Sequence, residues 1–447
     1  MTVHFDRKID DRNMAIRPGF RAAQWRMLLA TMFCYLFYYT GRQTFGFAIP
    51  GIERELGFDK QTLGWCSTAL LWSYAIGQAI NGNLGDKFGG RRMMSLGAVL
   101  SCGLNWIVSY GTTLWGVAVP WAANGYAQSM GWAPGSRVVS NWWPHQERGK
   151  AYGLYVFAAG MSSVLTYITS MLILEFGLNW RWIFRLPVLL LLCGSVTYYL
   201  IARDRPEDLG FDPLDRGEDD SEGAAEAPAA DSLPAETPPA DELLPADVTS
   251  RIESSAGRYL GVLSNVRFLL ASVAIGFQNL ARYGLLIWVP VHFLGDDWKH
   301  SETKWISIAL PVGMALGAMT SGWVSDRFFG SNRSRVISLF MLLASISALA
   351  MWVLSRESLV AVPLLFLAGF FAYGPQSAFW ALCPDLLGHR RAATGTGVMN
   401  AVAYLFAGLG EPLIGRLIDQ NGDTGIVFAV VAVACFIGAV LAVFIRR

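Results

Sequence analysis

Charged residues are scarce in this sequence. They make up 15% of its 447 residues, while hydrophobic residues make up 53%, and a soluble chain normally contains about 25% charged residues. This balance excludes an ordinary soluble domain. The formal net charge of +1 identifies no partner by itself, and we expect no nucleic-acid partner.

Cysteine and catalytic motifs are also missing or rare. The six cysteines all lie in apolar stretches and none forms a Cys-x-x-Cys pair, so we expect neither a disulfide framework nor a metal site. No GxxxxGK[ST] loop is present, which argues against an ATP-driven protein. No constellation of catalytic residues is apparent, so we predict that the protein is not an enzyme and needs no cofactor. The charged N-terminal tail lacks the apolar core and cleavage site of a signal peptide.

Long apolar runs dominate the chain instead. Each run has about 20 residues or more, enough to cross ~30 Å of hydrocarbon as a helix. We count twelve, at 25–48, 61–84, 93–112, 115–140, 151–176, 181–202, 266–292, 304–325, 335–354, 359–384, 393–418 and 424–445. The sequence therefore predicts an all-α membrane protein with twelve transmembrane helices in the lipid bilayer.

The charges that are present follow a topological pattern. Lysine and arginine gather in the N-terminal tail and in the even-numbered loops, at Lys87, Arg91, Arg92, Arg148, Lys150, Arg327, Arg333, Arg335, Arg390 and Arg391. This bias predicts that both termini are cytoplasmic. We expect a plasma membrane, with a bacterial inner membrane as the default, and a monomer.

The chain divides into two halves. Residues 203–265 include a stretch rich in Ala, Pro, Asp and Glu, which cannot bury enough apolar surface to fold. We predict a cytoplasmic tail at 1–24, a six-helix bundle at 25–202, a disordered cytoplasmic linker at 203–265 and a second six-helix bundle at 266–447.

The two halves carry the same loop motif. "GNLGDKFGGRR" follows the second run and "GWVSDRFFGSNRSR" follows the eighth, so that Asp86 and Asp326 are 240 residues apart. We expect these acids, together with Gly82 and Arg91, to clamp the cytoplasmic ends of helices. Arg137, at the end of the fourth run, is assigned a structural or gating role. Such a repeat predicts two pseudosymmetric bundles with a substrate site between them near the midplane.

Each half also contains one arginine inside an apolar run. Arg42 lies in the first run and Arg282 in the seventh, again 240 residues apart, and a proline follows each by eight residues. A cation at the bilayer centre costs about 2.5–3.5 kcal/mol even on a lenient scale. Snorkelling or pairing with a carboxylate is the alternative explanation, but neither run has an acid near its arginine.

Two facing arginines suggest an anionic ligand. Guanidinium groups are shaped for bidentate contact with oxyanions, and two of them match the charge of a phosphate dianion. The neighbours that we expect to complete a substrate site are Tyr39, Tyr74, Gln78 and Asn279.

Glu411 is an acid within the eleventh run. Intramembrane acids are by default functional candidates, so Glu411 is a candidate for coupling transport to protons or for contacting the substrate. It could instead meet water near a helix end or pair with Arg416.

The repeated loop resembles the signature of the major facilitator superfamily. "YYTGRQTFGFAIP", "NGYAQSMGWAPGSRVVSNWWPHQERGKAYG" and "LARYGLLIWVP" resemble the organophosphate:inorganic phosphate antiporter family. The resemblance covers nearly the whole chain except the linker. It implies that Arg42 and Arg282 are paired phosphate-binding arginines and that Tyr39 and Tyr74 line the site. Gln78 stands where bacterial glycerol-3-phosphate transporters carry a lysine, and Ala159 stands where they carry a histidine.

Three interpretations follow. The favoured one is a carrier that exchanges a phosphorylated small molecule, such as a sugar phosphate, glycerol phosphate or phosphoglycerate, for inorganic phosphate by alternating access. The second is a proton-coupled symporter of another organic anion on the same fold. The third is a membrane receptor that senses a sugar phosphate.

Overall fold

The computed structural model describes residues 19–212, 255–295, 302–329, 332–354, 358–387 and 389–445. This part of the chain contains α-helices and short 3₁₀ turns and no strand. The first half contains α1 (Phe20–Leu36), the turn η1 (Tyr38–Gly41), α2 (Phe45–Leu56), α3 (Lys60–Phe88), α4 (Gly90–Ser109), α5 (Leu114–Ser129), α6 (Trp132–Trp142), α7 (His145–Glu175), α8 (Arg181–Arg185), α9 (Pro187–Ile201) and the turn η2 (Pro206–Leu209). The second half contains α11 (Ser255–Leu263), α12 (Val266–Leu294), η4 (Glu302–Ile308), α13 (Ala309–Phe328), α14 (Arg333–Val353), α15 (Ala361–Tyr373), α16 (Gln376–Leu387), α17 (His389–Asn421) and α18 (Ile426–Val443).

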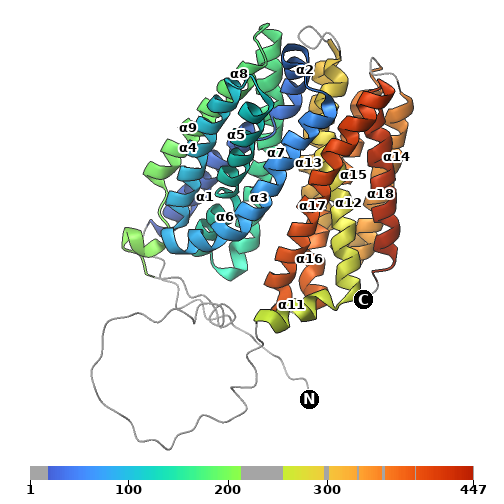
Figure 1. Cartoon of the computed structure of the whole chain (residues 1–447). Coiled ribbons are helices and arrows are strands. Elements are labelled where there is room, and N and C mark those ends of the chain that lie inside the picture. Colours follow the sequence, from blue (N-terminus) through green and yellow to red (C-terminus); the bar gives the residue numbers. More distant parts are fainter. Residues whose placement is uncertain are drawn as a thin grey trace, which may run out of the picture.

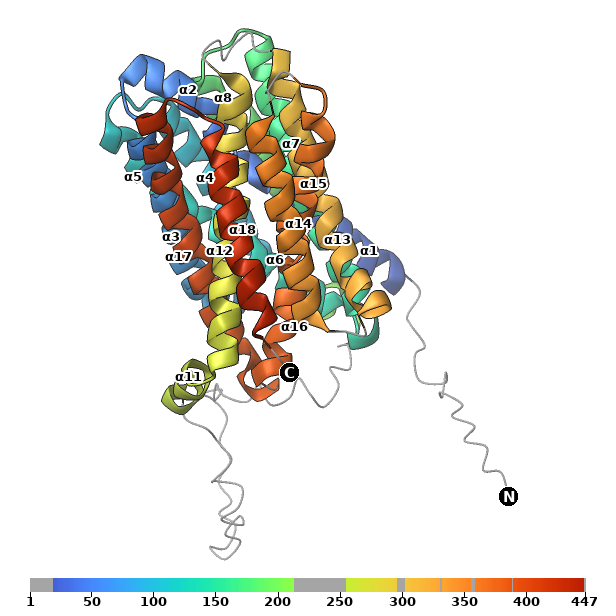
Figure 2. The ribbon, with the colours of Figure 1, turned by 90° about the vertical axis from the view of Figure 1, so that its right-hand side faces the viewer.

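The helices run roughly side by side in two groups. Those from α1 to α9 lie on one side of the molecule and those from α12 to α18 on the other (Figure 1). The start of α1, the short helix α11 and the end of α18 all lie at one end of the molecule, called here the terminal end (Figure 2). The opposite end, which holds α8 and the start of α3, is called the far end.

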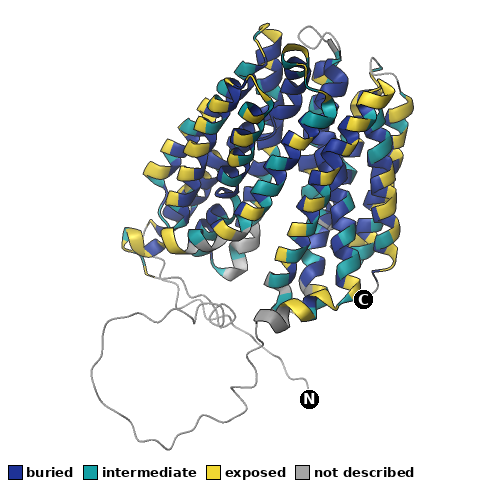
Figure 3. Ribbon diagram, in the orientation of Figure 1, coloured by how far each residue is buried: buried dark blue, intermediate teal, exposed yellow. Residues whose placement is uncertain are grey.

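The outer surface of the helices is apolar, as a lipid-facing surface must be. Exposed residues lie on the outside of both groups, whereas the interior between helices is buried (Figure 3). On α18 the outward side chains are 41–59% exposed and all hydrophobic, at Val433, Phe436, Val440 and Val443.

Seven stretches in the described residues are long and apolar enough to cross a membrane. They are Ala151–Glu175, Arg181–Ile201, Val266–Leu294, Arg333–Val353, Ala361–Leu387, Thr394–Asn421 and Ile426–Val443. Other predicted runs contain a helix break or many buried polar side chains, as in α4 with Ser101 and Asn105. Such polar residues lower the mean hydropathy of a helix. They are tolerated because neighbouring helices, and not lipid, surround them. The protein is an integral multi-pass membrane protein.

Both edges of the predicted linker are folded. Residues 203–212 include η2, and their backbone carbonyls accept hydrogen bonds from Trp142 Nε1 and Asn141 Nδ2. Phe211 packs edge-on against Phe20 at the start of α1. Residues 255–263 form α11. Apolar side chains at these edges give them a surface to bury, so the prediction of disorder is wrong there; residues 213–254 lie outside the described part.

The two halves are joined by polar contacts at the far end. They are the hydrogen bonds from the backbone N–H groups of Lys60 and Gln61 to the Asp419 carboxylate (3.2 and 2.8 Å), the bond from the Tyr167 hydroxyl to the Leu286 carbonyl (2.9 Å) and the ion pair between Lys304 and Glu175 (2.7 Å). Towards the terminal end the ribbons of the two halves diverge (Figure 1). The halves are therefore held together at the far end in this conformation.

Candidate substrate site

The first predicted run is not one continuous helix. α1 ends at Leu36, η1 makes one turn, and α2 begins at Phe45. Arg42 lies in the break, with φ −140° and ψ −20°. An unsatisfied backbone group in hydrocarbon costs several kcal/mol, so the break requires partners from elsewhere in the protein.

Two asparagines supply these partners. The Gly41 carbonyl accepts hydrogen bonds from Nδ2 of Asn105 on α4 (3.0 Å) and from Nδ2 of Asn124 on α5 (2.7 Å). A Cβ at Gly41 would lie 2.4 Å from Gln128 Nε2 and 2.6 Å from Ser101 Oγ, so any larger residue here would displace these side chains of α5 and α4. Neighbouring helices thus replace the missing helical hydrogen bonds and fix the position of the arginine that follows.

Arg282 lies in an unbroken helix. α12 runs continuously from Val266 to Leu294, and Leu and Ala precede the arginine where the first half has Thr and Gly. Leu and Ala favour helix, whereas glycine disfavours it by about 1 kcal/mol. The two arginines are equivalent in sequence position but are presented by different backbones.

Aromatic rings surround both guanidinium groups. The Cζ atom of Arg42 is 4.2 Å from the ring centroid of Tyr39 and 4.7 Å from that of Tyr74. The Cζ atom of Arg282 is 4.1 Å from the ring centroid of Tyr373 and 5.0 Å from that of its neighbour in sequence. That neighbour also lines the cavity that Arg42 borders, so the surroundings of the two cations meet there.

Neither arginine has an acidic partner in the described part of the chain. Arg42 is 9% exposed and Arg282 is 8% exposed, and no carboxylate of the described residues lies within 4 Å of either. The Nε of Arg282 also has no hydrogen-bond acceptor there. Burying an unpaired charge costs several kcal/mol, whereas a desolvated cation–π contact returns about 2 kcal/mol. The pair therefore lacks the counter-ion that an anionic ligand would supply.

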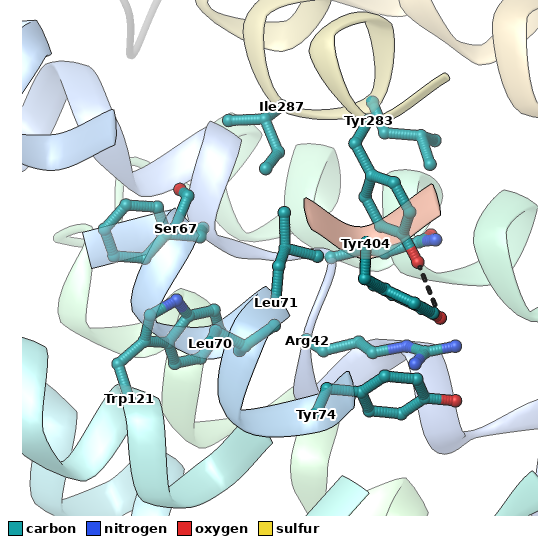
Figure 4. Close-up of a pocket in the computed structure, with 12 residues that line it drawn as sticks. Arg42, Ser67, Leu70, Leu71, Tyr74, Trp121, Tyr283, Ile287 and Tyr404 are labelled. Atoms are coloured by element: carbon teal, nitrogen blue, oxygen red, sulfur yellow. Dashed lines mark hydrogen bonds between the residues drawn. The ribbon is translucent and has the colours of Figure 1, made fainter. Parts of the chain in front are cut away.

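A small cavity lies between the halves beside Arg42, and Arg282 is not among its lining residues. It is lined by Arg42 and Tyr74 from the first half and by Tyr283 and Tyr404 from the second (Figure 4). The hydroxyl of Tyr283 donates to that of Tyr404 across 3.3 Å, drawn as a dashed line. The rings of Tyr74 and Tyr404 lie 5.1 Å apart. A continuous aromatic wall thus crosses from one half to the other.

The two predicted amides occupy different surroundings. Gln78 donates from Nε2 to the Tyr74 hydroxyl (2.8 Å) and accepts from Nδ2 of Asn400 in the other half (2.6 Å). Asn279 is buried and donates to the Ile275 carbonyl of its own helix (3.1 Å) and to its neighbour Gln278 (2.9 Å). Gln78 therefore adjoins the cavity wall, while the amide nitrogen of Asn279 is engaged with its own helix.

Glu411 does not line the cavity. It is fully buried on α17, and its Oε2 accepts a hydrogen bond from Trp288 Nε1 on α12 (2.8 Å). Its Oε1 has no partner among the described atoms. Arg416 is exposed and does not pair with it. The backbone of Glu411 contacts Gly64 on α3, which places this acid at the closed contact between the halves.

The predicted loop residues lie at the terminal end. Arg91 donates from its backbone N–H to Asp204 Oδ1 (2.8 Å) and from Nε to the Tyr199 carbonyl (2.8 Å), so it joins the start of α4 to the end of α9. Arg137 is half-buried on α6. The side chains of Asp86 and Asp326, and Gly82, lie outside the described part of the structure.

Sequence reasoning missed several residues of this site. Tyr373, Tyr404 and Asn400 lie in apolar runs where aromatic and amide residues most often serve packing, and nothing local distinguishes them. Asn105 and Asn124 were missed for the same reason. The available signal was the recurrence of amides inside runs that otherwise read as lipid-spanning.

The chain resembles known transport proteins over almost its whole length. Residues 31–411 and 271–447 match the protein-family model described as Major Facilitator Superfamily. The chain is 25% identical to a "Probable hexose phosphate transport protein" of Chlamydia pneumoniae, over 96% of this chain and 92% of that protein. It is also 25% identical to a "Glycerol-3-phosphate transporter" of Bacillus subtilis, over 94% and 91%. Among solved structures, a D-xylose–proton symporter aligns over 94% of this chain and 96% of that one, with a TM-score of 0.68 and 16% identity.

Proposed function

This chain belongs to the Major Facilitator Superfamily, and from that premise we propose that it exchanges a phosphorylated small organic molecule for inorganic phosphate. The observation that carries the proposal is the pair of buried arginines, one from each half, with no carboxylate of the described residues beside either. Relatives that span nearly the whole chain are named as hexose phosphate and glycerol-3-phosphate transporters, which supports a phosphate ester as the cargo.

In this proposal the arginines bind the phosphate and the tyrosines orient them. The rings of Tyr39 and Tyr74 hold the Arg42 guanidinium, and Tyr373 holds that of Arg282. Each planar group can offer two parallel N–H donors to phosphate oxygens. A dianion between them neutralises both positive charges.

Charge also explains why the carrier exchanges its substrates. Without a ligand the two cations repel each other in a medium of low dielectric constant, so bringing the halves together around an empty site is unfavourable. With phosphate bound, the repulsion becomes attraction and the closed intermediate is accessible. A carrier whose site reorients only when it is loaded must bind a second phosphate compound on the opposite side of the membrane before the site can return. In this proposal the terminal end is cytoplasmic, as the charge bias of the loops predicts, and the far-end contacts then hold the halves together on the non-cytoplasmic side.

Transport in proteoliposomes tests the proposal directly. Uptake of labelled phosphate is measured with and without unlabelled phosphate inside, and with and without an imposed pH gradient. We expect uptake only when phosphate is present inside, with no requirement for the gradient. Uptake that needs the gradient and no internal phosphate would indicate a proton-coupled symporter. Saturable binding without uptake would indicate a sensor.

Glu411→Gln tests whether a protein carboxylate drives transport. Because Glu411 lies outside the cavity and glutamine keeps an oxygen that can accept from Trp288, phosphate:phosphate exchange should stay within about twofold of wild type. Its pH dependence should follow the second ionisation of inorganic phosphate, the only substrate in this assay, and not the ionisation of a protein carboxylate. Exchange is measured between pH 5 and 8. The contrary result has two parts: the wild-type protein accumulates substrate on a pH gradient without internal phosphate, and the glutamine variant does not. That result would establish Glu411 as the coupling residue.

A further inference from the structure

A polar bridge crosses between the halves immediately beside the arginine site. Gln78 follows Tyr74 by four residues on α3, and Asn400 precedes Tyr404 by four residues on α17. Four residues correspond to about one helical turn, or ~6 Å along the axis. α3 runs from the far end to the terminal end, and α17 runs in the opposite direction (Figure 1). Both amides therefore lie one turn nearer to the terminal end than the Tyr74–Tyr404 ring pair.

The bridge is directly connected to Arg42. The Tyr74 ring lies under the Arg42 guanidinium, and the Tyr74 hydroxyl accepts the hydrogen bond from Gln78 Nε2. Only one side chain thus separates the cation from the amide pair. A ligand whose phosphate lies at the arginines and whose remainder points towards the terminal end, where the halves diverge, brings that remainder against Gln78 and Asn400.

The charge of the surroundings limits what that remainder can be. Among the described residues that line the cavity or bond to the amide pair, Arg42 is the only charged side chain, and Arg282 lies beside the lining residue Tyr283. Two cations balance one phosphate dianion. A carboxylate on the same ligand would lie against neutral amides without a cation of its own, and a charge desolvated in this way is costly.

Both amides can form hydrogen bonds with a hydroxyl group of a ligand. A hydroxyl both donates and accepts, and each primary amide offers an acceptor oxygen and two donor N–H groups. A ligand hydroxyl inserted into the bridge can accept from Asn400 Nδ2 and donate to Gln78 Oε1, replacing the 2.6 Å bond that now joins them. The bridge therefore keeps its hydrogen bonds satisfied both with and without ligand.

We propose that Gln78 and Asn400 form the subsite for the organic part of the substrate, and that this part is uncharged and hydroxylated. The substrate class is then a sugar or polyol phosphate and not a phosphorylated carboxylic acid. This inference rests on the proposed phosphate site and adds the residues that select the organic moiety.

Competition measurements on reconstituted protein test the selectivity. Unlabelled glucose 6-phosphate, glycerol 3-phosphate, 3-phosphoglycerate and phosphoenolpyruvate compete against labelled phosphate. We expect one of the two hydroxylated esters to inhibit at a concentration at least about tenfold lower than either carboxylic acid. Binding to purified protein is measured in parallel as the ligand-dependent rise in unfolding temperature. This second readout reports selectivity even if the protein does not exchange phosphate, so the failure of exchange and the failure of the subsite are distinguishable.

Variants identify the residues. Gln78→Leu and Asn400→Leu replace each amide by an apolar side chain of similar shape. For each variant we measure two half-inhibitory concentrations in the same preparation, that of the preferred ester and that of unlabelled phosphate. The readout is the ratio of the two. Losing a hydrogen bond that leaves a polar group of the ester unpaired weakens its binding, so this ratio should shift towards phosphate by about tenfold. Asn421→Leu, whose amide bonds to the Leu417 carbonyl of its own helix, is the matched control on α17 and should leave the ratio unchanged. The proposal is overturned if the carboxylic acids compete as well as the hydroxylated esters, or if neither leucine variant shifts the ratio.

Discussion

Arg42→Ala and Arg282→Ala will each abolish phosphate exchange while the protein still inserts and folds. Removing one partner of a buried, hydrogen-bonded charge pair costs about 2–5 kcal/mol, and 1.4 kcal/mol corresponds to a factor of ten in binding. Lysine keeps the charge but not the planar fork, so Arg→Lys at either position should also lose most of the exchange. The measurement is labelled-phosphate uptake into phosphate-loaded proteoliposomes.

Thermal unfolding separates a ligand-binding role from a structural one. In the ligand-free protein each arginine is buried without a carboxylate of the described residues beside it, so its removal eliminates an uncompensated charge. The alanine variants should therefore unfold at a temperature no lower than wild type in the absence of phosphate. They should also lose the rise in unfolding temperature that phosphate gives to the wild type.

Arg185 provides the matched control. Its guanidinium is also stacked on aromatic rings, 4.5 Å from the Tyr110 centroid and 5.2 Å from that of Trp182, but it lies on α8 and none of its rings is one of the tyrosines around Arg42 and Arg282. Arg185→Ala should retain the phosphate-dependent stabilisation. If Arg42→Ala or Arg282→Ala exchanges phosphate at a near-normal rate, or if both lower the ligand-free unfolding temperature and keep the phosphate response, the arginines are structural.

The sequence was enough to predict the fold class and the two central cations. Apolar runs of fixed length report membrane spans because hydrocarbon thickness sets the length of a helix. A charge inside such a run is conspicuous for the same reason, and an offset of 240 residues relates Arg42 to Arg282. These signals are local or depend on repetition, so they need no knowledge of which helices touch.

The remaining features depend on contacts that no local pattern encodes. The break before Arg42 is possible because Asn105 and Asn124, 64 and 83 residues away from Gly41, satisfy its carbonyl. Asn400 meets Gln78 across 322 residues. A run that contains these amides has a lower mean hydropathy. That value does not tell whether the amides face lipid, a neighbouring helix or a ligand.

Gly64→Ala and Gly46→Ala will open the far end and suppress exchange. A Cβ at Gly64 on α3 would lie 2.6 Å from the Glu411 carbonyl oxygen and 2.7 Å from Pro412 Cα, and a Cβ at Gly46 on α2 would lie 2.3 Å from the Ile287 carbonyl oxygen. Each clash is with backbone of the opposite half, which cannot rotate away as a side chain can. The added methyl therefore acts against the closed contact between the halves.

The size of the effect follows from the cost of overpacking. Inserting a methyl into a tight contact costs about 1–3 kcal/mol, which shifts a two-state equilibrium by about 5- to 150-fold. In the proposed alternating-access cycle the far end closes once per turnover, so the exchange rate should fall by a similar factor. The opening is measured as an increase in the distance between spin labels at Arg54 on α2 and Asn421 on α17, both exposed at the far end.

Two glycine controls distinguish gating from general destabilisation. Gly103 on α4 would place a Cβ in open space, and Gly103→Ala should change neither distance nor exchange. Gly125 on α5 would place a Cβ 2.2 Å from the Leu70 carbonyl oxygen within the same half, so Gly125→Ala should lower the unfolding temperature without separating the labels. If Gly64→Ala behaves like Gly125→Ala, the glycine contact serves only packing. If Gly64→Ala instead separates the labels and keeps the unfolding temperature of wild type, the close approach of α3 and α17 is the closed state of a gate. Such a contact has to form and separate in each cycle. Backbone surfaces that meet without interlocking side chains are suited to that.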